Sequence, residues 1–168
     1  TASALRHLNA AHVESLEHSP DGRPFIVMEY VEGLSLRELI SRGGYIPAPD
    51  VLDIIGQVCA ALDCAHHQGI IHRNLKPDNV IITEGRDGAS RVKVMEFGMA
   101  NLRQAAAESG RQVGDVVMTD KGAVVGMMEY MSPEQAAGPG PGKLDVRSDI
   151  YSVGVMMFEA MTGELPIA

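Results

Sequence analysis

The side chains best suited to chemistry gather in one short stretch, I-I-H-R-N-L-K-P-D-N at residues 70–79. Asn74 lies between the cationic residues Arg73 and Lys76, and a second carboxamide, Asn79, follows five positions after Asn74. A carboxamide oxygen accepts a hydrogen bond, but it takes up no proton near neutral pH. The stretch could therefore position a hydroxyl group without deprotonating it.

The elements predicted before this stretch are a strand and two helices. The run F-I-V-M-E-Y at residues 25–30 is rich in β-branched and aromatic residues, which favours a buried strand. A short helix is predicted over residues 35–41. A longer helix, which we expect Asp50 to cap, repeats apolar residues at helical spacing until Gly69 supplies a stop.

The elements predicted after this stretch are two strands and a helix. Residues 80–83 and 91–95 are predicted to be short strands joined by a turn-rich segment. Ser148 is expected to cap a helix over residues 149–162 that is apolar nearly all round. Such a helix belongs in the centre of a fold.

Five segments resemble the motifs of bacterial-type serine/threonine protein kinases, in the order in which that family carries them. They are F-I-V-M-E-Y-V-E-G at 25–33, the loop at 70–79, E-F-G at 96–98, Y-M-S-P-E-Q at 130–135 and S-D-I-Y-S-V-G-V at 148–155. In the family these segments are the hinge, the catalytic loop, the magnesium-binding motif, the end of the activation segment and the central helix. Any one motif is weak evidence, whereas five in order indicate the family.

The resemblance implies a nucleotide site at the hinge. The backbone of Glu29 and Val31 would meet adenine, Met28 would be the gatekeeper, and Ile81 would form the floor of the adenine pocket. The resemblance thus makes ATP an expected ligand.

The resemblance also implies structural and activation-segment residues. His72 would pack in the core beneath Phe97, and Asp149 would be the buried anchor of the catalytic loop. Arg73 would face the activation segment, where it could bind a phosphate on a threonine. The residues assigned to that segment are Arg73, Thr119 and Glu134.

The departures from the family pattern fall on the chemistry. Asn74 stands where the family has the aspartate base, although Lys76, which would neutralise the transferring phosphoryl group, and Asn79, which would hold magnesium, are both kept. The second metal ligand is Glu96 in place of aspartate, and its extra methylene displaces the oxygens by about 1.5 Å. Met127 replaces a threonine that bonds the base and the lysine. Loss of a general base alone costs about 10² to 10⁴ in rate, so impaired catalysis is predicted.

Composition describes a globular chain of 168 residues with 45% hydrophobic and 21% charged residues. A net charge of -8 without any block of like charges argues against a nucleic-acid partner. No apolar run approaches the roughly 20 residues of a membrane span. Cys59 and Cys64 are expected to be buried, reduced thiols.

The predicted fold class is α+β, a protein-kinase-like fold with the hinge, a mainly helical large lobe and most of the small lobe absent. No lysine precedes Lys76, and no G-x-G-x-x-G occurs in the chain, whereas a complete kinase needs both an upstream lysine and a glycine-rich loop. We therefore expect a piece of a larger polypeptide. Residues 1–33 would be the end of the small lobe and the hinge, and residues 34–168 the first part of the large lobe.

Two functions from different classes follow. The first is a pseudokinase-like module that binds a protein partner and ATP. Its binding of magnesium would be weakened, and a module that binds only protein would require no cofactor. The alternative is the central part of an active kinase that transfers the ATP γ-phosphoryl group to serine or threonine of a protein substrate. A third, remote alternative is a degraded reading frame that does not fold. The resemblance implies a bacterial, cytoplasmic protein.

Overall fold

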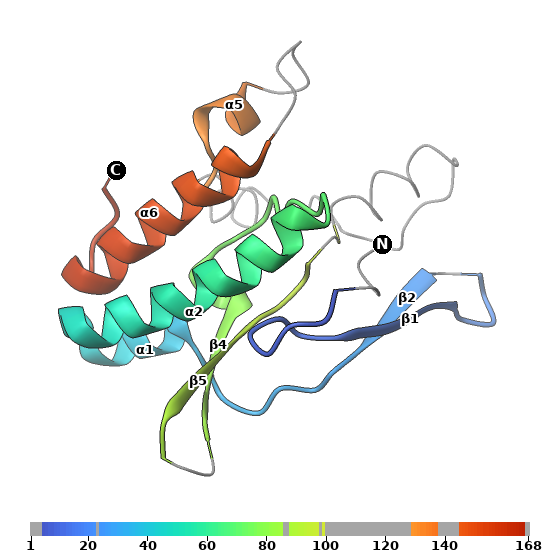
Figure 1. Ribbon diagram of the computed structural model, residues 1–168, viewed down its shortest axis with the longest axis horizontal. Helices are drawn as coiled ribbons and strands as arrows, with labels where there is room; N and C mark the ends of the chain where they lie inside the picture. Colours follow the sequence, from blue (N-terminus) through green and yellow to red (C-terminus); the bar gives the residue numbers. More distant parts are fainter. Residues whose placement is uncertain are drawn as a thin grey trace.

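The structure is a computed structural model that describes residues 5–22, 24–85, 88–97, 99, 129–137 and 145–166 (Figure 1). It is an α+β arrangement of two small sheets and a group of helices, as the sequence predicts. The elements in chain order are β1 (Val13–His18), β2 (Pro24–Met28), β3 (Leu34–Ser35), α1 (Leu36–Gly43), α2 (Ala48–His67), the 3-10 helix η2 (Pro77–Asn79), β4 (Val80–Glu84), β5 (Ser90–Val94), α5 (Pro133–Ala136) and α6 (Val146–Thr162).

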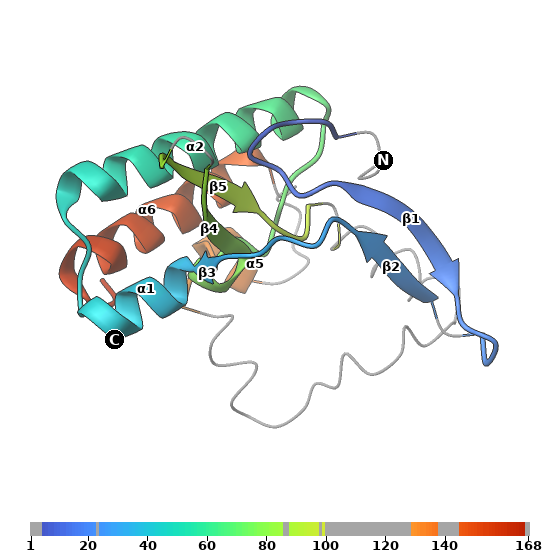
Figure 2. The same ribbon diagram turned by 90° about the horizontal axis from the view of Figure 1, so that it is seen from below.

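Strands β1 and β2 form an antiparallel pair that lies away from α1 and α6 (Figure 2). Leu16 pairs with Ile26, and Val13 pairs with Met28. The predicted strand over residues 25–30 is present as β2, but the prediction that it is buried was wrong. Phe25 is 44% exposed and Tyr30 is 89% exposed. An apolar run marks a strand, whereas burial requires neighbours on both faces, and this sheet has two strands in the described part of the chain.

The second sheet has the order β3-β4-β5, and all its neighbours are antiparallel. Val80 pairs with Val94, which brings the end of β5 beside η2. The segment before β1 also joins this sheet, because the amide of Val94 donates to the carbonyl of Asn9 at 2.8 Å and Ala11 donates to Val94 at 2.9 Å. The segment before β1 is therefore tied directly to the strand that ends at the candidate site.

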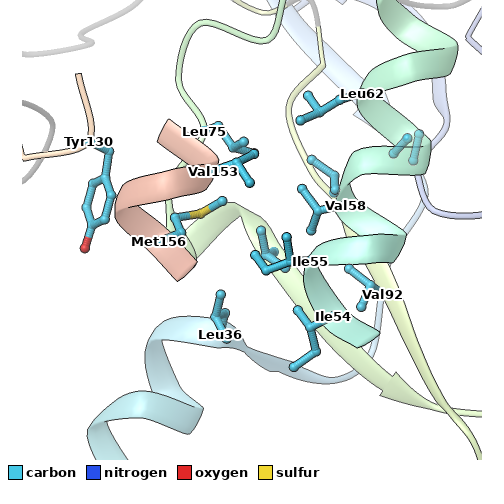
Figure 3. Packing of buried hydrophobic residues seen from close by; sticks show 14 of the residues in the cluster. Leu36, Ile54, Ile55, Val58, Leu62, Leu75, Val92, Tyr130, Val153 and Met156 are labelled. Carbon is cyan, nitrogen blue, oxygen red and sulfur yellow. The ribbon is translucent and has the colours of Figure 1, made fainter. Parts of the chain in front are cut away.

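The core lies between α2, the second sheet and α6. In Figure 3 the apolar side chains of α2 face β5 on one side and α6 on the other. The buried residues contributed by α2 include Val51, Ile54, Ile55, Val58 and Leu62. They meet Val92 of β5 and Val153 and Met156 of α6, which are at most 7% exposed. The helical spacing of apolar residues thus identified the face of α2 that is buried.

Two predicted helix caps were wrong. Helix α2 begins at Ala48 with Pro47 at the N-cap position, so Asp50 lies within the first turn. Helix α6 is capped by Asp145, whose carboxylate accepts from the amide of Arg147 at 2.8 Å, and Ser148 is buried inside the helix. Several residues before each apolar run could be the N-cap. The N-cap is the residue whose backbone is still extended, and the sequence alone does not show which residue that is.

Two predictions about burial also need correction. Helix α6 is buried on one side only, because Ile150 is 53% exposed and Phe158 is 42% exposed. The cysteines are free, as expected of reduced thiols, but Cys59 is exposed and Cys64 is half-buried. Among the described residues, no helix combines the length and hydropathy that a membrane span requires.

Candidate functional site

The buried carboxylate of Asp149 fixes the loop at residues 70–79 to helix α6. It is 1% exposed and accepts hydrogen bonds from the backbone amides of His72 and Arg73, each at 2.9 Å. The ring of His66 on α2 donates to the same carboxylate at 2.7 Å. Asp149 lies in the first turn of α6, where a negative charge suits the helix dipole. One carboxylate therefore joins α2, α6 and the loop.

His72 connects the loop to the end of β5. Its Nε2 donates to the carbonyl of Met95 at 2.8 Å, and its ring meets that of Phe97 edge to face with centroids 4.9 Å apart. Its Nδ1 accepts from the amide of Asn74 at 3.3 Å, which fixes the neutral Nε2–H tautomer. Burial lowers the pKa of His72, and the nearby charge of Asp149 only partly opposes this. His72 is therefore a neutral structural residue.

Two residues of the site hold a left-handed backbone conformation that is rare outside glycine. Arg73 has φ 66° and Glu96 has φ 62°. At Arg73 the conformation is supported from both sides, since Asp149 accepts from its amide and Gln135 donates to its carbonyl at 2.9 Å. Such strain is maintained where surrounding contacts outweigh it, which is common at functional sites.

The residues assigned to the activation segment are only partly described. Glu134 in α5 accepts from the hydroxyl of Ser148 at 2.7 Å, and this bond lowers the pKa of Glu134. The buried Nε of Arg73 has no hydrogen-bond partner among the described residues. The predicted partner, Thr119, lies outside the described residues, as do Met127 and Gly98.

The two carboxamides and Glu96 form a hydrogen-bonded cluster. The Nδ2 groups of Asn74 and Asn79 both donate to Oε2 of Glu96, at 3.3 and 3.4 Å. Asn79 also donates to the backbone carbonyl of Asn74 at 2.9 Å. Lys76 lines a small cavity with Asn74, next to Tyr130. The structure thus joins three of the four residues predicted for phosphoryl chemistry and metal binding, and it places Lys76 at a cavity beside Asn74.

The donor set of this cluster suits a divalent cation poorly. Magnesium prefers carboxylate oxygens, and Glu96 is the single carboxylate beside two carboxamides. In the described part of the chain, no three or more His, Cys, Asp or Glu residues are grouped as metal ligands. The prediction that Asn79 and Glu96 hold a metal stays a prediction.

The predicted nucleotide residues lie at the junction of β2 and the second sheet. The amide of Glu29 donates to the carbonyl of His12 at 2.8 Å, and its carboxylate accepts from Lys93 at 2.9 Å. Burial raises the pKa of Glu29, but the bonds from Lys93 and from the amide of His12, together with the nearby positive charge, lower that pKa below its usual value. Met28 ends β2, and Ile81 is half-buried opposite Lys93 on the neighbouring strand. Residues opposite each other share a face, and Lys93 bonds to Glu29, so Ile81 lies on the side of the sheet that faces Glu29.

Sequence reasoning missed one buried polar network. Arg37 on α1 pairs with Glu159 on α6 at 2.5 Å, and the hydroxyl of Tyr130 bonds to both side chains, with 2.5 Å to Glu159. Glu159 is 5% exposed. Burial raises the pKa of the Tyr130 hydroxyl, and the carboxylate of Glu159 raises it further. The partners are 29 to 122 residues apart, so no local pattern joins them. The available signal was an acidic residue inside an apolar helix.

Comparison with known proteins identifies the family. The protein kinase domain family matches residues 2–168, so the chain belongs to the protein kinase family. The serine/threonine-protein kinase pkn3 of Myxococcus xanthus is 41% identical over 165 residues, covering 98% of this chain and 28% of that protein. PknB of Mycolicibacterium smegmatis is 40% identical over 168 residues, covering 98% of this chain and 24% of that protein. The chain is thus a bacterial-type serine/threonine protein kinase domain sequence that spans about a quarter of these relatives.

The fold is also confirmed by solved structures. The kinase domain of Mycobacterium tuberculosis PknI, solved as a double mutant, superposes with a TM-score of 0.71 at 25% identity. The match covers 99% of this chain and 56% of that one. Both the predicted family and the predicted kinase-like fold are therefore correct.

Proposed function

We propose that this chain is a pseudokinase-like part of a kinase domain, one that binds a protein partner and adenine nucleotide but transfers phosphoryl groups poorly. The observation that carries the proposal is the side chain of Asn74. A general base must lie within hydrogen-bond reach of the hydroxyl and must then hold its proton. A carboxamide cannot hold that proton, and the Nδ2 group of Asn74 is directed at Glu96.

Retained architecture supports a binding role. Asp149, His72 and Phe97 still build the loop and its contact with β5. At the hinge, the bond from Lys93 turns the carboxylate of Glu29 toward β5, which leaves backbone groups of Glu29 and Val31 as the expected contacts for adenine. The site therefore keeps the parts that position a ligand, and it has lost the group that would move the proton.

The second candidate function is an active kinase that transfers the ATP γ-phosphoryl group to a protein hydroxyl. Lys76 and Asn79 favour it, because both residues needed beside the phosphates are present. So does the identity of about 40% to proteins named serine/threonine kinases. Removal of a positioned base leaves residual rates about 10² to 10⁴ below normal, so sensitive detection is required.

The deciding experiment measures transfer of radiolabelled phosphate from magnesium-ATP by the full-length protein that contains this chain. We expect no transfer above the level of the Lys76→Ala variant. We also expect activity to appear when Asn74→Asp is combined with Glu96→Asp. Turnover in the unaltered protein that disappears with Lys76→Ala would refute the proposal in favour of the active kinase.

Nucleotide binding is tested separately by thermal-shift titration of ATP with and without magnesium. A rise in melting temperature is expected, because a ligand that binds only the folded state stabilises it. The matched variant is Ile81→Arg, which places a charged side chain at the expected floor of the adenine pocket. No shift in the unaltered protein would leave only the protein-binding role.

A further inference from the structure

We propose that the carboxamide of Asn74 takes the place of a divalent cation in holding Glu96 to the catalytic loop (residues 70–79), so that this site is held together without a metal ion. The inference rests on the proposed function, since a transferring enzyme would need the cation to neutralise phosphate charge. It joins two of the departures from the family pattern, Asn74 and Glu96, into one interaction.

The orientation of the Asn74 amide is set by its surroundings. Its Nδ2 lies 3.3 Å from Oε2 of Glu96, and the Nδ2 of Asn79 lies 3.4 Å from the same oxygen. Rotation of the Asn74 amide would bring its Oδ1 against Oε2, and two acceptors would then face each other without a proton between them. Glu96 therefore selects the donor side of Asn74, which points away from use as a metal ligand.

The two substitutions complement each other in charge. An aspartate at position 74 would place a second carboxylate beside Glu96, and two carboxylates at this separation require a shared proton or a cation. Asparagine removes one negative charge and supplies a donor. The longer side chain of Glu96, carried on a backbone with φ 62°, reaches that donor across the loop.

A cation that enters this cluster must compete with two N–H donors for one carboxylate oxygen. The oxygens offered by the two carboxamides are neutral, and affinity of hard cations depends strongly on the number of charged ligands. Restoring a carboxylate at position 74 should therefore create cation affinity. Removing the Asn74 amide without adding charge should raise the affinity by less.

The test is a titration of manganese ion followed by the electron paramagnetic resonance signal of free Mn²⁺, on the full-length protein without nucleotide. Asn74→Asp is expected to bind Mn²⁺ about tenfold or more tightly than the unaltered protein, because the site gains a charged ligand. The double variant Asn74→Asp with Glu96→Gln again has one carboxylate, and it should return to the affinity of the unaltered protein. Equal affinity of the unaltered protein and Asn74→Asp would overturn the proposal.

A second variant keeps the test decisive if Asn74→Asp does not fold. Asn74→Ala deletes the donor and adds no charge, so Mn²⁺ should bind about two- to tenfold more tightly, which corresponds to one hydrogen bond. Unchanged affinity in Asn74→Ala would contradict the idea that Asn74 competes with a cation.

The result of the Mn²⁺ titration can be interpreted separately from the result of the phosphate-transfer assay. The titration contains no ATP and no phosphoryl acceptor. Phosphate transfer by the unaltered protein would refute the proposed function whatever the Mn²⁺ affinities are. Tight Mn²⁺ binding by the unaltered protein would refute only the present inference.

Discussion

Replacing Asp149 by alanine should release the loop at residues 70–79 from helix α6. The carboxylate is 1% exposed and accepts from the backbone amides of His72, which is buried, and of Arg73, which is half-buried, at 2.9 Å each. Leaving a buried donor unsatisfied costs about 1 to 3 kcal/mol, so the loss lies between about 2 kcal/mol and an upper limit of about 6 kcal/mol that is reached only if both amides stay dry. His66 is left out of this sum, because its side chain is partly exposed (14%).

This loss is best measured as local opening by hydrogen–deuterium exchange of peptides that cover residues 70–79, in the full-length protein. Since about 1.4 kcal/mol is a factor of ten, Asp149→Ala should speed exchange of these amides by about 30-fold to 10⁴-fold. In Asp149→Asn the exchange rate should lie between that of the unaltered protein and that of Asp149→Ala. The reason is that the single carbonyl oxygen of asparagine can accept from one of the two amides.

The matched control is Asp63→Ala on helix α2. The side chain of Asp63 is 76% exposed, and among the described residues its one ion-pair partner is His67, at 3.4 Å. Exposed positions of this kind change stability by about 0.5 kcal/mol or less, so exchange of residues 70–79 should stay at the unaltered rate. Unaltered exchange in a folded Asp149→Ala variant would show that the carboxylate does not hold the loop.

Two further predictions concern packing and backbone geometry. Arg37→Met leaves the buried carboxylate of Glu159 without its cationic partner, so it should lower the free energy of unfolding by about 3 to 5 kcal/mol, measured as a lower melting temperature. The control, Arg147→Met, removes an exposed ion pair and should lower the free energy of unfolding by less than about 1 kcal/mol. Adding Glu159→Gln to Arg37→Met should recover part of the loss, and strictly additive effects would argue against the pair. Gly163→Ala should destabilise the folded protein, because Gly163 has a φ of 77° and a Cβ there would collide with the backbone oxygen of Gly44. Gly154→Ala has free space for a Cβ and should stabilise the folded protein by about 0.5 to 1 kcal/mol. Equal melting temperatures for the two glycine variants would contradict this account.

The positions of β2, α1, α2, β4, β5 and α6 were predictable from the sequence, whereas β1, β3, η2 and α5 were not predicted, and the ends and burial of the elements were not predictable. The spacing of Val51, Ile54, Val58 and Leu62 places their side chains on one helix face, and that face is buried. The cap of α6, by contrast, is Asp145, whose backbone is still extended, and not Ser148, which lies in the first turn and donates to Glu134. That bond depends on a helix that precedes α6 by several residues, so no local pattern contains it.

The candidate site shows the same division. The order of motifs named the residues at 72, 74, 79, 96 and 149, and the structure places them within one connected set of hydrogen bonds. The direction of the Asn74 amide was not predictable, because it depends on where the carboxylate of Glu96 lies. The network of Arg37, Tyr130 and Glu159 was missed for the same reason.

The sequence by itself determined the family, the order of most of the longer elements and the presence of a carboxamide at position 74, where a proton acceptor was expected. These properties are fixed by residue type and spacing along the chain. Only the tertiary structure decided which groups satisfy one another, namely that Glu96 is bonded by two carboxamides and that one buried aspartate joins two helices and a loop. Hydrogen bonds and burial depend on distances between segments that are remote in sequence, and folding alone sets those distances.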